Sequence, residues 1–180
     1  MQVAALHDTT KIIDAKTKKL KVHYLYKYDF DDYEGGTDYS KMFVTKLMLN
    51  RTGQCHSLPL LFLVLAQQFG ANAYLSFSPN HSFIRFKDDK GKMRNIELTN
   101  HMLTSDAFVI GSGYVKSEAL KSKIYLDTFT IRQAIAECFV DLAHGYVAKN
   151  CYDDFVLKCT DEALKYIPND IVKFAGKIFI

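Results

Sequence analysis

The sequence lacks the features that mark several large classes of protein. It has no apolar run of the roughly 18 to 20 residues that a membrane-spanning helix needs, and residues 1–11 lack the charged and apolar regions of a signal peptide. The net charge is only +3, and the one dense lysine run, Lys16–Lys21, is typical of a solvated strand entry. We therefore expect a soluble chain with no membrane span and no nucleic-acid partner.

Metal-binding spacings are also absent. The chain has four cysteines, and none is separated from the next by the two to four residues of a zinc-ligand pair. The acidic segment 29–34 lacks the spacing of an EF-hand loop. We expect no metal and no cofactor. Three of the cysteines (Cys138, Cys151 and Cys159) lie in helical-looking sequence and are typical of small buried hydrophobes.

What is present is enough for one domain with an appendage. The chain has 180 residues, of which 48% are hydrophobic. Alternating apolar residues predict a strand over residues 20–28, and Asp38 is typical of the N-cap of a helix that runs to about residue 48. Three further strand-like stretches (residues 71–77, 81–86 and 93–98) and a set of long amphipathic helices follow. The pattern predicts an α+β fold, with one unit over residues 1–128 and a helical segment over residues 129–180.

Cys55 opens the most strongly apolar run in the chain. Leucines and phenylalanines recur at helical spacing and also fill the other positions up to Phe69, which predicts a helix that is buried on nearly all sides. Pro59 falls within its first turn, where proline is tolerated, and Gly70 stands where a C-terminal cap belongs. Unpaired N–H groups at the start of such a helix favour a thiolate, so Cys55 is a candidate nucleophile. The alternative is a buried and inert cysteine.

A strand-like pair after this helix carries a histidine and an acid. Residues 81–86 and 93–98 are joined by turn residues 88–91. Pairing about this turn puts His81 opposite Glu97, with about 5 Å between the Cβ atoms and both side chains on one face. Glu97 could then hold the imidazole and leave its other nitrogen free for a thiol. The alternative is a surface hairpin with a chance His–Glu pair. His56 follows Cys55 directly, and because consecutive helical residues point about 100° apart, we expect it to be a polar neighbour and not the base.

The last 50 residues predict two amphipathic helices, one from Thr130 and one after Asn150, followed by Pro168 and a third short apolar helix. Small residues at Ala143 and Gly145, with an aromatic residue at Tyr146, resemble a tetratricopeptide-type hairpin. Such helices are a possible surface for a protein partner.

The segment from about residue 38 to residue 100 resembles the transglutaminase-like superfamily, which is a rearranged relative of the papain-like hydrolases. The resemblance lies in three motifs: Gly-Gln-Cys-His-Ser-Leu-Pro at 53–59, Asn-His-Ser-Phe-Ile at 80–84, and Asn-Ile-Glu-Leu-Thr-Asn at 95–100. It implies Cys55 as the nucleophile, His81 as the base, and Glu97 in the place of the family's usual aspartate. Bacterial members of the superfamily pair this domain with tetratricopeptide-like helices.

The resemblance also implies an oxyanion hole. One donor would be the backbone N–H of Cys55, and a second would come from Gln54 or from a neighbouring side chain. Asn80 either closes the site beside His81 or only forms the turn with Pro79. Many family members have tryptophan two residues after the base, where this chain has Phe83; the chain contains no tryptophan. That difference, together with the missing calcium site, favours hydrolysis over transamidation.

Two functions follow from these observations. The first is a thiol-dependent hydrolase or acyltransferase that acts on an amide or peptide bond of a peptide or protein substrate, through a Cys55–His81–Glu97 triad and an acyl-thioester. The second is a catalytically inactive scaffold of the same fold that binds a protein partner through its C-terminal helices.

Overall fold

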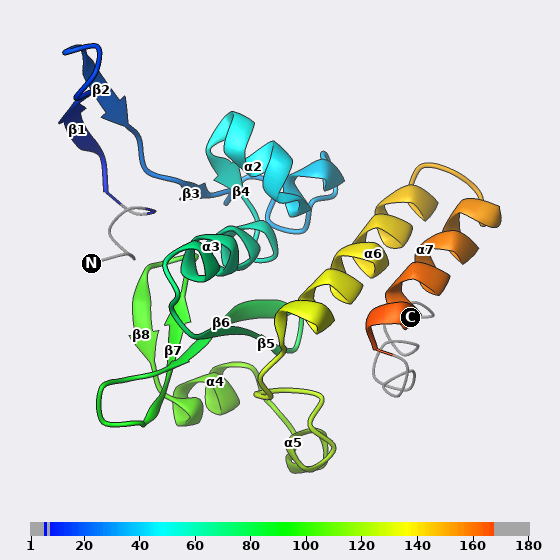
Figure 1. Ribbon diagram of the computed structural model, residues 1–180. Helices are drawn as coiled ribbons and strands as arrows, with labels where there is room; N and C mark the ends of the chain where they lie inside the picture. The colour runs from blue at the N-terminus through cyan, green and yellow to red at the C-terminus, as the bar shows by residue number, and fades with distance from the viewer. Residues whose placement is uncertain (1–5, 7, 168–180) are drawn as a thin grey trace.

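The computed structural model describes Leu6 and residues 8–167, and these residues form an α+β fold (Figure 1). The strands are β1 (Thr10–Ile13), β2 (Leu20–His23), β3 (Lys27–Tyr28), β4 (Thr52–Gly53), β5 (Ala73–Ser78), β6 (His81–Lys87), β7 (Met93–Glu97) and β8 (Met102–Thr104). The helices are the 3₁₀ helix η1 (Tyr39–Met42), α2 (Val44–Asn50), α3 (Ser57–Gln68), α4 (Asp106–Ser112), α5 (Ser117–Lys121), α6 (Ile131–Val147) and α7 (Asp154–Tyr166). Within the described residues, no helix is both long and apolar enough to cross a membrane.

The main sheet is an antiparallel meander of four strands in the order β5-β6-β7-β8. The turn between β5 and β6 consists of Pro79 and Asn80, because Ser78 pairs directly with His81. Proline fixes a negative φ at the first turn position, and Asn80 has a φ of 55°, which is the combination that type II turns use. This tight turn places His81 at the very start of β6.

Helix α3 packs on this sheet and forms the centre of the core. Buried side chains from the helix (Leu58 and Leu61) meet buried side chains from the strands (Leu75, Ile84 and Ile96). The helix stops as the sequence predicts, since Gly70 follows it with a φ of +66°, the left-handed conformation that glycine adopts without strain. A helix buried on most sides gives the residue at its N-terminal end a fixed position.

Helices α6 and α7 form the predicted hairpin, and α6 also belongs to the central core. Thr130 and Gln133 form a reciprocal capping box at the start of α6. Ala134, Ala136 and Val140 of α6 lie in the same buried cluster as the residues of α3 and the sheet. The boundary at residues 128 and 129 therefore falls inside one continuous core. The third helix predicted after Pro168 lies outside the described residues.

The predicted single strand over residues 20–28 is wrong in its middle. The chain forms β2, leaves the β1–β2 pair after His23, and then pairs as β3 in parallel with β4. The intervening residues have other partners: the N–H of Tyr26 donates to the carbonyl of Leu6, and the guanidinium of Arg51 lies 5.8 Å from the centre of the Tyr26 ring. The helix predicted from Asp38 is also divided, because η1 and α2 are separated by extended backbone at Phe43.

Candidate active site

Cys55 lies in the short turn between β4 and α3, at the N-terminal end of the buried helix. The backbone N–H of Gln54 donates to the hydroxyl of Ser57 over 2.9 Å, and that hydroxyl donates to the carbonyl of Lys41 over 2.7 Å. Residue 53 must be glycine for the turn to pack against Leu47 of α2, because a Cβ atom there would lie 2.8 Å from Cδ1 of Leu47. The turn is therefore fixed to both α2 and α3, and Cys55 is only 6% exposed.

His81 and Glu97 meet across the sheet, although the predicted register is wrong by two residues. The observed pairs include Ile84 with Ile96 and Lys87 with Met93, because the hairpin closes through residues 88–92 with Gly91 at a φ of +76°. In this register Glu97 is level with Phe83 and is a diagonal neighbour of His81. A shift of two residues keeps both side chains on the predicted face, since side chains alternate with a period of two.

The His81 ring is held at Nε2, which hydrogen-bonds to Oε2 of Glu97. The other carboxylate oxygen, Oε1, accepts from the backbone N–H of Thr99 over 3.0 Å and from its hydroxyl over 2.9 Å. Thr99 is a site residue that the sequence reasoning missed. Its only signal is its place two residues after the acid, where a side chain can return to cap the carboxylate.

The second nitrogen of the His81 ring, Nδ1, is left for the thiol, and the two side chains form a hydrogen bond. Burial opposes ionisation of the thiol, but the hydrogen bond from His81, the charges of His56 and His81 and the N–H of Ser82 together hold the pKa of Cys55 below its usual value. Burial likewise opposes a charged imidazole, but the hydrogen bonds to Cys55 and Glu97 raise the pKa of His81 to about 10. Both shifts favour a thiolate–imidazolium pair over a neutral thiol and a neutral imidazole.

Ser82 holds the nucleophile from the strand side. Its hydroxyl donates to the carbonyl of Cys55 over 2.5 Å, and its backbone N–H points at the thiol. Because Ser82 follows His81 directly, one strand positions both the base and the backbone of the nucleophile.

Gln54 and Asn80 occupy different surroundings. Gln54 is fully buried, and its side-chain nitrogen donates to the carbonyl of Asp32 in the acidic loop. Asn80 is exposed in the turn between β5 and β6. The structure thus uses Gln54 to attach the loop to the nucleophile turn and Asn80 to form the turn beside the base.

Tyr28 and His56 are two further ring side chains that interact with the thiol of Cys55. Tyr28 lies beside Gly53 in the β3–β4 pair and interacts electrostatically with both Cys55 and Glu97. Burial and these negative charges raise the pKa of Tyr28 to about 12, so its hydroxyl stays protonated. His56 is a polar neighbour, as its sequence position predicts, and its Nδ1 lies 2.9 Å from Oδ2 of Asp141 on α6.

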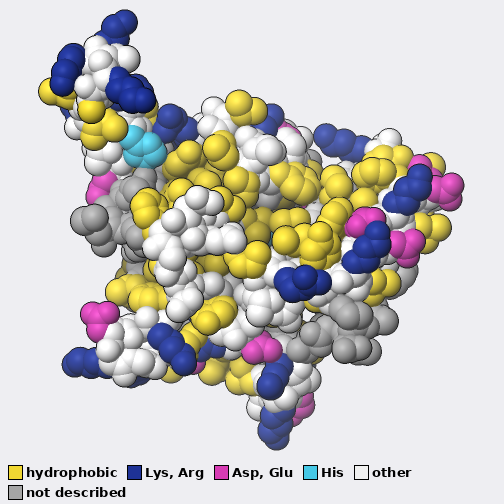
Figure 2. Space-filling view, viewed as in Figure 1, with side chains coloured by type: hydrophobic (Ala, Val, Ile, Leu, Met, Phe, Trp, Pro, Cys, Tyr) yellow, Lys and Arg dark blue, Asp and Glu magenta, His cyan; other side chains and the backbone are white. Residues whose placement is uncertain are grey.

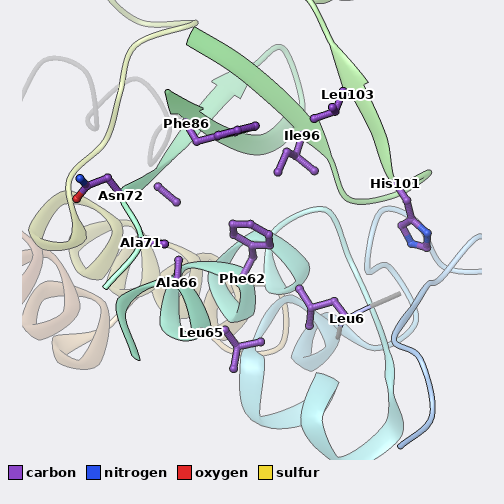
Figure 3. Close-up of a pocket in the computed structure, with 11 residues that line it drawn as sticks. Leu6, Phe62, Leu65, Ala66, Ala71, Asn72, Phe86, Ile96, His101 and Leu103 are labelled. Carbon is purple, nitrogen blue, oxygen red and sulfur yellow. The ribbon is translucent and has the colours of Figure 1, made fainter. Parts of the chain in front are cut away.

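Two apolar hollows of the molecule lie away from this triad. A cavity of about 460 Å³ lies between α3, the sheet and Leu6. Figure 3 shows Phe62, Ile96 and His101 among its lining residues. A wider groove of about 710 Å³ runs between α2, α3 and α6. Neither hollow is lined by Cys55, His81 or Glu97.

The chain has no match among protein-family models, curated proteins or solved structures.

Proposed function

We propose that this protein is a thiol-dependent hydrolase or acyltransferase of the transglutaminase-like type, acting on an amide or peptide bond. One observation carries the proposal: Cys55, His81 and Glu97, from a helix N-terminus and two strands, are joined in that order by hydrogen bonds. A nucleophile, a base and a group that orients the base are the three parts that acyl transfer to a thiol requires.

The reaction would proceed in two stages. The Cys55 thiolate attacks the carbonyl carbon of the substrate, and the tetrahedral intermediate collapses to a thioester when His81 gives its proton to the leaving amine. The neutral imidazole then removes a proton from water, and the resulting attack on the thioester releases an acid and restores the thiolate. An amine in place of water would give a new amide. Glu97 stabilises the imidazolium in both stages.

The resemblance of residues 38–100 to the transglutaminase-like superfamily agrees with this assignment. The helix led by the nucleophile and the antiparallel strands with the base and the acid occur in the order that the resemblance implies. In this proposal the α6–α7 hairpin takes the place of the tetratricopeptide-like helices that bacterial members of the superfamily carry. The family assignment is part of the proposal.

The first test is the pH dependence of Cys55 alkylation by iodoacetamide, followed by peptide mass spectrometry. Cys151 is exposed and supplies an internal reference in the same sample. We expect Cys55 to react with a midpoint well below the usual value of about 8.5, and His81→Ala to remove that low midpoint. A midpoint for Cys55 equal to that of Cys151 would refute the enzyme assignment. A positive result justifies a screen of peptide amides with and without an added amine, which separates hydrolysis from transamidation.

The second candidate is the inactive scaffold, and the surface of the helices favours it. Figure 2 shows hydrophobic side chains gathered over α3 and the adjacent part of α6. Four hydrophobic residues that line the groove between α2, α3 and α6 are more than a third exposed: Val64, Ile131, Ile135 and Leu142. A protein partner would bind along this groove. If the alkylation midpoint of Cys55 is that of an unperturbed cysteine, the inactive scaffold becomes the better assignment.

A further inference from the structure

His56 and Asp141 form a second imidazole–carboxylate pair beside the nucleophile. His56 follows Cys55 directly and precedes the first residue of α3, whereas Asp141 lies 85 residues later on α6, which runs beside the N-terminal end of α3 (Figure 1). Nδ1 of His56 lies 2.9 Å from Oδ2 of Asp141. Asp141 is only 4% exposed, and a carboxylate at that depth requires a partner to offset its lost hydration.

The charges around His56 favour its cationic form. Asp141 and Glu137 face it from α6, and Cys55 adjoins it in the chain. From η1, the neutral phenol of Tyr39 interacts with the same two carboxylates. Burial alone would lower the pKa of His56, but the charges of Asp141, Cys55 and Glu137 and the hydrogen bond to Asp141 raise it to about 9.

Cys138 shows that burial beside the α6 carboxylates disfavours a thiolate. Burial and the charges of Asp141 and Glu137 raise the pKa of Cys138 to about 11. Cys55 is also buried, yet its pKa is shifted downward, and His56 is one of the charges responsible. The positive charge of His56 therefore interacts both with the carboxylates of α6 and with the thiolate of Cys55.

We propose that Asp141 is a positioning residue of the thiol site, which holds His56 in place as a second cation beside the Cys55 thiolate. The inference rests on the proposed function and adds α6 to the site. The two histidines have different roles. His81 transfers the proton, because its ring is hydrogen-bonded to the thiol, whereas His56 is bound at Nδ1 by Asp141 and acts through its charge.

The size of the effect follows from the usual influence of a nearby opposite charge. Such a charge within about 4–6 Å lowers the pKa of an acidic group by about 1–3 units, and we expect the lower end because His81 already supplies one cation. Loss of the His56 cation should therefore raise the alkylation midpoint of Cys55 by about one pH unit. Well below that midpoint, the alkylation rate should fall about tenfold.

The test is Asp141→Asn in the full chain, since asparagine keeps the volume of the side chain and removes its charge. We expect the Cys55 midpoint to rise by about one pH unit, and the NMR titration of His56 to move from near pH 9 toward the ordinary value of about 6.5. Asp141→Glu keeps the charge, so its Cys55 midpoint and its His56 titration should both stay close to those of the parent. Glu162→Gln is the matched control, because it removes an exposed α7 carboxylate whose observed partner is Lys165. It should change neither midpoint.

A second variant keeps the inference open to refutation if Asp141→Asn fails to fold. His56→Gln should raise the Cys55 midpoint by the same amount, and Asp141→Asn combined with His56→Gln should add nothing to either change. The inference is overturned if the parent shows the low midpoint, loses it in His81→Ala, and keeps it in a folded Asp141→Asn or His56→Gln variant. That result would leave the proposed function intact. An ordinary midpoint in the parent would instead refute the proposed function and the inference together.

Discussion

Gly53→Ala is the sharpest test of how the nucleophile turn is built. The added Cβ would lie 2.8 Å from Cδ1 of Leu47 and would also meet the hydroxyl of Ser57, closer than real Cβ contacts occur. Both neighbours are fully buried, so neither can rotate into solvent. The hydroxyl of Ser57 also accepts from the N–H of Gln54 and donates to the carbonyl of Lys41, and displacing it would disturb both bonds.

We expect this substitution to destabilise the protein by about 2–3 kcal/mol, the upper part of the usual range for overpacking. For a chain of 180 residues, about 1 kcal/mol changes the melting temperature by about 2–4 °C, so the expected fall is about 4–12 °C. Thermal unfolding followed by circular dichroism measures it.

Gly111→Ala provides the control for this experiment. Gly111 lies within α4, and a Cβ there would meet nothing within 4 Å. Because alanine is the better helix former, we expect Gly111→Ala to melt at or slightly above the temperature of the parent. If Gly53→Ala melts within about 1 °C of the parent, the turn is not packed as described, and the position assigned to Cys55 is wrong.

Three further predictions concern the residues around the triad. Thr99→Val removes the hydroxyl that donates to Glu97, a bond worth about 0.5–1.5 kcal/mol, and should slow Cys55 alkylation at pH 6 roughly two- to tenfold; an unchanged rate would show that Thr99 does not hold the acid. Tyr28→Phe should leave the alkylation midpoint in place, because the phenol is neutral, but slow single-turnover acylation by an activated ester roughly 100-fold if its O–H is an oxyanion donor. Equal acylation rates would exclude that role. The pKa of His56 is raised from 6.5 to about 9, so the stability that its charge contributes is complete below about pH 6.5 and is lost as the pH rises to about 9. In urea unfolding, the parent should have a larger free energy of unfolding than His56→Gln, and this difference should shrink as the pH rises through the interval. A difference that does not change with pH would contradict the raised pKa of His56.

The sequence was sufficient for the elements of the site but not for its register. The apolar run after Cys55 predicts α3, because its leucines and phenylalanines recur at helical spacing; Val64, however, lies on an exposed face that the pattern does not predict. The face shared by His81 and Glu97 was also predictable, since it depends only on whether residue numbers are odd or even. The pairing was displaced by two residues because the loop at 88–92 closes through a glycine with positive φ, and the backbone conformation of that glycine is not encoded in the strand pattern.

Contacts between distant segments were not predictable from one sequence. The strand expected over residues 20–28 is interrupted because β3 pairs with β4, which carries only two residues and no strand pattern of its own. The sequence pattern predicts Gly145 to be a small residue between helices, whereas in the fold it makes room for the ring of Tyr39. Cε1 of that ring lies only 2.7 Å from where a Cβ of residue 145 would stand. Asp141 stood in an amphipathic helix with nothing to mark it as a partner of His56.

The share of α6 in the central core also has a consequence for synthesis on the ribosome. Cys55, His81 and Glu97 are all made before Asp141, which follows Glu97 by 44 residues (141 − 97). At about 5–20 residues per second, translation of that interval takes about 2–9 s. During this time the nascent chain holds the nucleophile, the base and the acid, but the buried side chains of α6 have not yet closed the core. The finished thiol site therefore forms only after α6 has been made, several seconds after its nucleophile, base and acid.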